Sequence, residues 1–318
     1  MTPTQLRAFA AVVRLGSVKQ AAAELGVSES AVSLHVGQLR KELGDQLFTR
    51  TAAGLAFTPG GLRLASRGAE MLGLQDRTIR EVSQAGGGRR LLRVAAASLF
   101  AEHAAPGLIE LFAARADDLD VELSVRSPHQ FSTLLLSRAV DVAIGPAPGN
   151  LDATVICRPI LNYQIVVVAS PDHPLSKVHA GPSQLREQTW LLGPSAASDA
   201  GVVPDLLRRI NVPESRQRIF QSHAAALEEA KRNNGVALAV SFAVARDLAS
   251  GGLVRITGPA LQTEGVWNTL TLPEQSTLSA TAELMRFVTT PRATQAMLRG
   301  SGVNVGHFRP SVYVTLWS

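Results

Sequence analysis

The hydrophobic pattern changes character at one glycine-rich segment, and this change constrains the fold more than any other feature. Before QAGGGRR (residues 84–90), apolar residues recur at spacings of three and four, as in amphipathic helices. After it, short apolar runs alternate with helix-like segments, which is typical of βαβ units around a parallel sheet. Glycine-rich segments are flexible. We therefore predict a linker between a helical module and an α/β module, and a length of 318 residues accommodates both.

The front module is predicted to begin with three short helices. Thr2, Pro3 and Gln5 form the pattern of a capping box with a first-turn proline. Ser17 is placed to open a second helix, and Ser28 a third. The third helix carries an apolar stripe, spaced by four, three and four residues, formed by Val32, Val36, Leu39 and Leu43.

The connection Gly26-Val27-Ser28 has the spacing of a helix-turn-helix, whose second helix enters the DNA major groove. A generic three-helix bundle would show the same spacing. Residues 46–58 (QLFTRTAAGLAFT) form two apolar runs around an Ala-Ala-Gly turn, which predicts a β-hairpin. A hairpin beside the third helix can lie as a wing against a phosphate backbone, so it favours the DNA-binding interpretation.

Thr58 and Pro59 are predicted to begin a long helix over about residues 60–84. One face of this helix repeats at alternating spacings of three and four through Leu62, Ala65, Ala69, Leu72, Asp76 and Ile79. That face suits a dimer seam with one polar interruption. A helix packed on its own domain is the alternative.

The excess positive charge lies entirely in the front module. Residues 1–90 carry 12 Lys and Arg against 7 Asp and Glu, whereas residues 91–318 carry 19 against 19. This asymmetry points to an anionic partner for the front module, although an excess this small can also arise by chance. The single cysteine, Cys157, permits no internal disulfide and no thiolate metal cluster. Without a recognisable signal peptide or membrane-spanning run, we expect a cytoplasmic chain with no membrane partner.

The second module is predicted to form two α/β lobes facing each other. Expected strands lie at residues 91–97, 121–126, 141–145, 164–170, 190–193, 218–222 and 236–242. Expected helices lie at residues 98–115, 129–139, 202–210 and 224–233. Small ligands bind in the cleft at the carboxyl ends of such strands.

The front module closely resembles the winged helix-turn-helix of LysR-type transcriptional regulators. The matching features include Gly16-Ser17, Ala21-Ala22, Leu25 to Ser28, Ala31 to Ser33, Leu39, Glu42-Leu43-Gly44, Leu47-Phe48 with Arg50, and Thr58 with Gly61. Weaker agreement continues to about residue 290 through Asp141 to Gly145, SPDHPL (170–175) and Asn234-Gly235-Val236.

The resemblance implies an α+β multidomain chain. A winged helix-turn-helix, all-α with a small β wing, would span residues 1–59, and a dimerising linker helix with a glycine-rich hinge would span residues 60–90. A two-lobed α/β effector domain resembling periplasmic binding proteins would span residues 91–290, with lobe I at 91–160 and 266–290 and lobe II at 161–265. Residues 291–318 would form a tail. The implied partners are promoter DNA, a small-molecule effector, further copies of the chain up to a tetramer, and RNA polymerase.

The family's base-contacting positions fall on Glu29, Ser30, Ser33 and Leu34, where many members have Gln, Pro, Ser and a basic residue. A carboxylate at Glu29 can accept from cytosine N4, and Leu34 can contact a thymine methyl. The alternatives are a carboxylate stabilised at the helix start for Glu29 and burial for Leu34. The remaining candidates are donors to DNA phosphates: Ser17, Ser28, His35, Lys41, Thr49, Arg50, Thr51 and Thr58. The alternative for Arg50 is solvated surface.

Candidate effector ligands follow the expected strands. They are Ser98, Ser127, His129, Ser195, Ser198, Asp199 and Ser222. Hydroxyls and backbone N–H groups at helix starts form an anion site, so we expect a small carboxylate effector. Each serine could instead be an ordinary helix cap.

The sequence predicts no catalytic site, cofactor or metal. It contains no Gly-x-Ser-x-Gly elbow, no phosphate-binding loop after Leu91 and no His-Glu-x-x-His motif, and its histidines lack metal-ligand spacing. The rival function, a solute-binding protein of periplasmic-binding type without a regulatory role, leaves the first 90 residues unexplained. The YVTLW segment near the carboxyl end could add an edge strand or be disordered.

Overall fold

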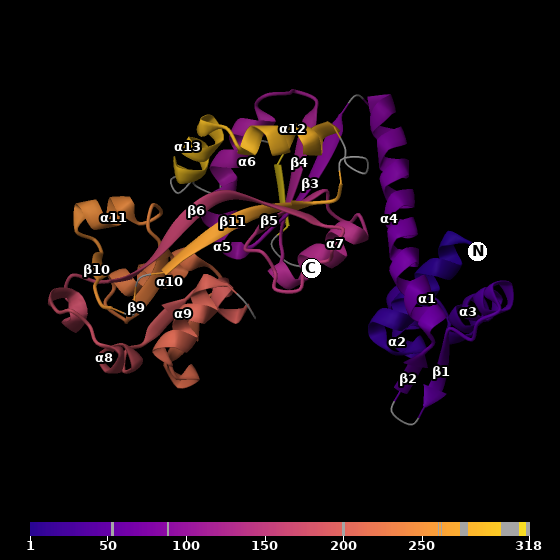
Figure 1. The fold of residues 1–318 in the computed structure, drawn as a ribbon, viewed down its shortest axis with the longest axis horizontal. Helices are drawn as coiled ribbons and strands as arrows, with labels where there is room; N and C mark the ends of the chain where they lie inside the picture. The colour runs from indigo at the N-terminus through magenta and orange to yellow at the C-terminus, as the bar shows by residue number, and fades with distance from the viewer. Residues whose placement is uncertain are drawn as a thin grey trace. The chain divides into compact units, whose positions relative to one another are not determined.

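The computed structural model describes residues 1–51, 54–87, 89–198, 201–259, 261, 263–273, 279–299 and 312–315. Its contacts divide the chain into two compact units, each of which is considered by itself (Figure 1). The first unit comprises Met1–Gly87 with Leu136–Ala139, and the second comprises Gly88–Leu135 with Val140–Ser318. Among the described helices, none is both long and apolar enough to span a membrane.

The first unit consists of three short helices, a hairpin and a long helix. These elements are α1 (Pro3–Leu15), α2 (Val18–Leu25), α3 (Glu29–Leu43), β1 (Phe48–Thr51), β2 (Gly54–Phe57) and α4 (Pro59–Gly87). Thr2 and Gln5 form the predicted capping box. Gly16 and Gly26 end α1 and α2 with φ of 65° and 64°, a conformation that glycine adopts without strain.

The core of the first unit lies where the three short helices meet the hairpin. The inward side chains of α3 are Val32, Val36 and Leu39, as the periodicity predicts. Leu43, the fourth residue of the predicted stripe, is 44% exposed because it is the last residue of the helix. Phe48 stacks on Phe9 and makes an edge contact with Phe57. The hairpin therefore shares the core of the helices.

Helix α4 is longer than the sequence suggests. It runs through Gly87, so the prediction of a flexible linker is wrong for residues 84–87, and β3 begins at Arg90. A glycine costs a helix interior about 1 kcal/mol relative to alanine. Propagation of a formed helix is cooperative, so a long helix can continue through such residues.

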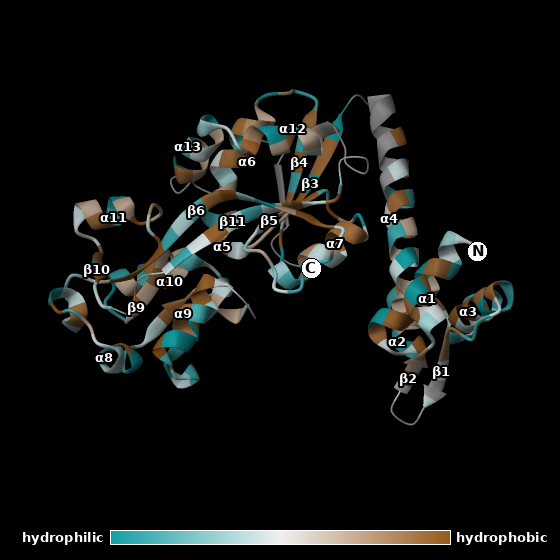
Figure 2. Ribbon diagram, viewed as in Figure 1, coloured by the Kyte–Doolittle hydropathy of each residue, from teal (hydrophilic) through white to brown (hydrophobic). Residues whose placement is uncertain are grey.

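The face of α4 predicted as a dimer seam is used in part by its own domain. Ala65 packs against the core of the first unit, and the Asp76 carboxylate accepts a hydrogen bond from Arg7 at 3.0 Å. Hydrophobic residues nevertheless recur along this helix (Figure 2). The large apolar side chains that remain exposed on α4 are Leu62, Met71, Leu74, Ile79 and Val82.

In the described residues, the second unit is built on one mixed sheet of ten strands. The strands are β3 (Arg90–Ala96), β4 (Leu119–Val125), β5 (Val142–Gly145), β6 (Ile156–Ala169), β7 (Trp190–Leu192), β8 (Gln217–Ile219), β9 (Val236–Val240), β10 (Val254–Ile256), β11 (Thr263–Thr271) and β12 (Val312–Thr315). Their order is β12-β4-β3-β5-β11-β6-β9-β7-β8, with β10 paired to β6. We call β12, β4, β3 and β5, with helix α5 (Ser98–His103) packed on them, the first lobe, and β9, β7, β8 and β10, with helix α10 (His223–Lys231), the second lobe.

Two long antiparallel strands, β6 and β11, join the lobes (Figure 1). Within the lobes the predicted parallel pairing is confirmed, since β3 pairs in parallel with β4 and β5, and β7 with β8 and β9. The sequence did not predict β11, and it placed the start of β6 eight residues too late, at residue 164 rather than Ile156. Most of that missed extension is exposed or half-buried, so it lacks the apolar run that marks a buried strand.

Short helices cover the sheet. They are α5 (Ser98–His103), α6 (Ala105–Ala113), α7 (Phe131–Leu136), α8 (Pro182–Arg186), α9 (Val202–Ile210), α10 (His223–Lys231), α11 (Ala245–Ser250), α12 (Ser279–Val288) and α13 (Pro291–Arg299). The single helix expected over residues 98–115 is interrupted at Ala104, with Pro106 near the start of α6. Proline lacks the N–H that a continuous helix would need there.

The segment expected as a tail contains regular structure. Helix α13 contacts α6, and its Ala293 and Met297 join the core of the second unit. Strand β12 pairs in parallel with β4 at the edge of the sheet. Of the two alternatives for the YVTLW segment, the structure shows the edge strand for its first three residues, while Leu316 and Trp317 lie outside the described residues.

Candidate functional sites

The first candidate site is the outward face of α3. Ser28 caps this helix, accepting a hydrogen bond from Ala31 N at 3.2 Å, and its hydroxyl lies 2.8 Å from that of Ser30. Ser30 and Ser33 are exposed, and Leu34 is 60% exposed, so the alternative of burial does not hold for Leu34. These side chains point away from the core in the first two turns of the helix, which is the part that contacts bases in helix-turn-helix proteins.

Charged and ring side chains flank this face. Glu29 is the first residue of α3 and is exposed, a position where the helix dipole also favours a carboxylate. Lys41 is exposed in the last turn. The buried Nδ1 of His35 has no hydrogen-bond partner among the described residues.

The hairpin is fixed to α3 by an arginine that the sequence did not single out. Arg40 Nη2 donates to the carbonyl oxygen of Phe48 at 2.7 Å, and its guanidinium lies 4.5 Å from the centre of the Phe48 ring. Arg50 is a residue of β1 and pairs with Leu55 across the hairpin, while its side chain lies outside the described part of the chain. Thr49, also in β1, is exposed.

The hydroxyls proposed as phosphate donors differ in how far the fold already uses them. Ser17 accepts a helix-capping bond from Gln20 N at 3.4 Å, which leaves its own proton available. Thr51 donates to the carbonyl of Gly54 at 3.0 Å. Thr58 is the most committed, because it donates to Asp45 at 2.7 Å and accepts from Gly61 N at 2.9 Å. The bond from Thr58, aided by Leu47 N, holds the pKa of Asp45 below its ordinary value.

The second candidate site joins three elements of the second unit, with a hydroxyl, an imidazole and a carboxylate in a row. Ser195 lies in the short helix Pro194–Ala197, and its Oγ is 2.9 Å from Nε2 of His223, the first residue of α10. The other ring nitrogen of His223, Nδ1, is 2.8 Å from the carboxylate of Glu102 on α5. The neighbouring Ser222 caps α10.

Glu102 occupies the start of α10. Its two oxygens accept hydrogen bonds from the backbone N–H groups of His223 at 2.9 Å and Ala224 at 2.7 Å. Burial alone would raise the pKa of Glu102, but the hydrogen bonds and charge of His223 outweigh burial, so the pKa falls to about 2. The chain therefore supplies its own carboxylate to the anion-binding end of this helix.

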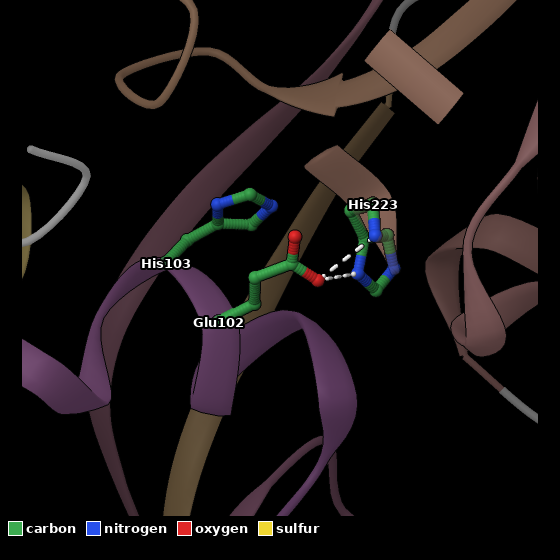
Figure 3. Close-up of side chains that lie close together, drawn as sticks. All are labelled: Glu102, His103 and His223. Atoms are coloured by element: carbon green, nitrogen blue, oxygen red, sulfur yellow. Dashed lines mark hydrogen bonds and ion pairs between the residues drawn. The ribbon is translucent and has the colours of Figure 1, made fainter. Parts of the chain in front are cut away.

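His103 completes the cluster (Figure 3). Its ring is 5% exposed and lies 5.6 Å from the His223 ring, measured between centroids. Burial lowers the pKa of His103 to about 4, and the nearby His223 contributes in the same direction. Its Nε2 has no hydrogen-bond partner among the described residues.

The structure brings together only some of the predicted effector ligands. Ser195 and Ser222 meet at His223, and Ser98 lies on α5 one turn before Glu102. Ser127 and His129 form a separate pair in the first lobe, with Ser127 Oγ 2.8 Å from His129 Nδ1. Ser198 ends the helix Pro194–Ala197, and Asp199 lies outside the described residues.

Sequence reasoning missed Glu102, His103, His223 and Gly193. Glu102 and His223 are 121 residues apart, so no local spacing links them. The sequence did offer one weak signal, the glycine at position 193 at the end of a predicted strand. In the structure a Cβ at this position would lie 2.3 Å from Cδ2 of His223. A glycine at the end of a predicted strand can mark the close approach of another group.

Two family descriptions match this chain over most of its length. Residues 3–62 match "Bacterial regulatory helix-turn-helix protein, lysR family", and residues 85–290 match "LysR substrate binding domain". An uncharacterized HTH-type transcriptional regulator of Mycobacterium tuberculosis is 60% identical over 321 residues, covering 100% of both chains. The chain belongs to the LysR-type family of helix-turn-helix transcriptional regulators. It is therefore a regulator with an effector-binding domain and not an enzyme, and the predicted fold class is confirmed.

Solved structures share this fold. ArgP from Mycobacterium tuberculosis is 20% identical with a TM-score of 0.58, and the match covers 91% of this chain and 96% of that one. Full-length CbnR, solved in complex with its target DNA, is 18% identical with a TM-score of 0.56, and the match covers 91% of this chain and 99% of that one.

Proposed function

We propose that this regulator binds double-stranded promoter DNA sequence-specifically, with α3 in the major groove and the β1–β2 hairpin against a phosphate backbone. The observation that carries the proposal is the exposed face of α3 formed by Ser30, Ser33 and Leu34. These three residues lie in a helix that is capped by Ser28, and their side chains are directed to solvent. The excess positive charge of residues 1–90 supports an anionic partner for this unit.

We further propose a homodimer formed through α4, and a tetramer made of two such dimers, so that the paired DNA-binding units of a dimer read two half-sites. The exposed apolar residues of α4, such as Met71, Leu74 and Val82, support this assembly because water-exposed apolar side chains gain free energy on burial. RNA polymerase would be a further partner, and the cytoplasm the site of action.

For the effector domain we propose a small carboxylate ligand. The proposed contacts are Ser98, Ser127, His129, Ser195, Ser198, Asp199 and Ser222.

The Glu102 carboxylate already accepts hydrogen bonds from the backbone N–H groups at the start of α10, and it would repel a second carboxylate there. Ser127 and His129, which bond to each other in the first lobe, are the proposed contacts that this repulsion leaves unaffected. A thermal-shift screen of the full chain against small carboxylic acids tests this proposal. A rise in melting temperature that is lost in Ser127→Ala would support it, and no rise with any acid would contradict it.

The DNA proposal is tested by replacing Arg50 in the hairpin. Arg50→Ala should weaken binding to all duplex sequences and reduce the slope of log affinity against log salt concentration by about 1, because one phosphate contact is lost. Fluorescence anisotropy of labelled genomic fragments at several salt concentrations measures both quantities. The matched control is Arg218→Ala, an exposed arginine of β8 in the second unit, which should change neither. Unaltered affinity and slope in Arg50→Ala would contradict the proposed orientation.

A further inference from the structure

We propose that Glu102, His103 and His223 form a binding site for a divalent transition-metal ion that joins α5 of the first lobe to α10 of the second. The three residues offer ligand atoms that all lie within 4.8 Å of one another. Figure 3 shows the Glu102 carboxylate between the two imidazole rings. This site does not depend on the proposed function, because it rests on the second unit alone.

The donor set fits this class of ion. Two imidazoles and one carboxylate form a ligand set of zinc sites that keep one position open, and imidazole also suits copper, nickel and iron. Ligands at about 2.0–2.1 Å from a tetrahedral zinc lie roughly 3.3 Å apart. The three ligand atoms lie within 4.8 Å of one another, so small rotations about side-chain bonds can bring them onto one ion.

His103 supplies an independent indication of a ligand. Its ring is 95% buried, its Nε2 has no hydrogen-bond partner among the described residues, and its ring faces the Glu102 carboxylate (Figure 3). A buried polar atom without a partner is unfavourable and uncommon in folded proteins. A metal ion coordinated by Nε2 would remove that cost.

The contacts of His223 allow it to change from hydrogen-bonding to coordination. In the neutral ring, Nδ1–H donates to Glu102 and Nε2 accepts from the Ser195 hydroxyl. When the ion binds Nδ1, the ring proton moves to Nε2 and Ser195 turns from donor to acceptor, which a hydroxyl can do. Histidine ligands of metals usually donate their second ring N–H to an oxygen acceptor, a role that the Ser195 hydroxyl oxygen would fill here.

Glu102 retains the capacity to bind the ion while it caps α10. An ionised carboxylate offers about four acceptor positions. Three accept the hydrogen bonds from His223 N, His223 Nδ1 and Ala224 N. No other described residue donates to the fourth, and coordination at His223 Nδ1 releases another.

The experiment is calorimetric titration of zinc chloride into the chelator-treated full-length protein. We expect one saturable site per chain that is lost in His103→Leu. Ser195→Ala should retain the ligands and bind about tenfold to a hundredfold more weakly, since it removes the partner of the ligating ring. His179→Leu, an exposed histidine outside the cluster, is the matched control and should bind as the parent protein does.

Titration of the parent protein with Co²⁺ gives a second measurement that does not depend on how any variant folds. Visible absorption of low-coordinate Co²⁺ in the parent protein would support the site, and Glu102→Gln, checked for native circular dichroism, should lose that band. The proposal is overturned if the folded parent protein shows no saturable Zn²⁺ or Co²⁺ binding. It is equally overturned if binding persists unchanged in both His103→Leu and Glu102→Gln, which would show adventitious binding by other histidines.

Discussion

The outward face of α3 and the contact between α5 and α10 use similar residue types in opposite ways. On α3, Ser30 and Ser33 are exposed, so their outward positions remain accessible to an external partner. In the second unit, Ser195, His223 and Glu102 bond to one another across three elements. The exposed side chains of α3 can therefore contribute to recognition of a partner without contributing to the fold. The bonded side chains of the second unit form a candidate ligand site and also stabilise the fold. Mutations at the two sites should therefore separate changes in stability from changes in recognition.

The largest effect is expected at Glu102. Glu102→Ala removes a carboxylate that accepts two backbone hydrogen bonds and one from Nδ1 of His223. Leaving the ring and backbone donors of the buried His223 unpaired should lower the free energy of unfolding of the second unit by about 3 kcal/mol. All three tryptophans lie after residue 91, so denaturant unfolding followed by tryptophan fluorescence reports on this unit.

The control for this comparison is Glu110→Ala, which removes an exposed carboxylate on α6 and should cost less than about 0.5 kcal/mol. Equal stabilities of the two variants would show that the hydrogen bonds of Glu102 do not stabilise the fold, and the contrast with α3 would disappear.

Gly193→Ala tests the same contact from the other side. The new Cβ would lie 2.3 Å from Cδ2 of His223, so the ring must shift and its bonds to Ser195 and Glu102 are disturbed. Overpacking of this kind should reduce stability by about 1–3 kcal/mol in the same fluorescence measurement. Gly149→Ala is the control, since a Cβ there meets nothing within 4 Å. A fully stable Gly193→Ala protein would mean that the ring has room to shift.

The two regions also differ in how far the sequence predicts them. The three short helices of the first unit depend on signals a few residues apart, such as the Thr2 and Gln5 capping box and the left-handed glycine Gly26, and the structure confirms both of these signals. The Glu102–His223 contact arises from strand order and from the long strands β6 and β11. No local pattern encodes a contact across 121 residues, so predicted ligands such as Ser195 were found without the groups that hold them.

A smaller effect is expected at Thr58, which was predicted as a phosphate donor but also caps α4. Thr58→Val keeps the shape of the side chain and removes the bonds to Gly61 N and Asp45. Loss of a helix cap should cost about 1 kcal/mol, measured by thermal unfolding followed by circular dichroism. Thr49→Val, at an exposed position of β1, should cost less than about 0.5 kcal/mol. If Thr58→Val instead weakens DNA binding without loss of stability, its hydroxyl acts on phosphate and not in the fold.

Ser33 should show the smallest change in stability and a clear change in recognition. Its side chain is exposed on α3, so Ser33→Ala should alter the free energy of unfolding by less than about 0.5 kcal/mol. If the hydroxyl contacts a base edge, the same variant should change discrimination between operator sequences by about 1–3 kcal/mol. The control is Lys41→Ala, at an exposed position in the last turn of the same helix. It should weaken binding to all sequences alike, because a phosphate contact carries no sequence information.

Competition binding with a randomised set of duplexes measures the effects of both substitutions. A uniform loss of affinity in Ser33→Ala would place this residue on the backbone, and α3 would then lie differently in the groove from the way its exposed face suggests.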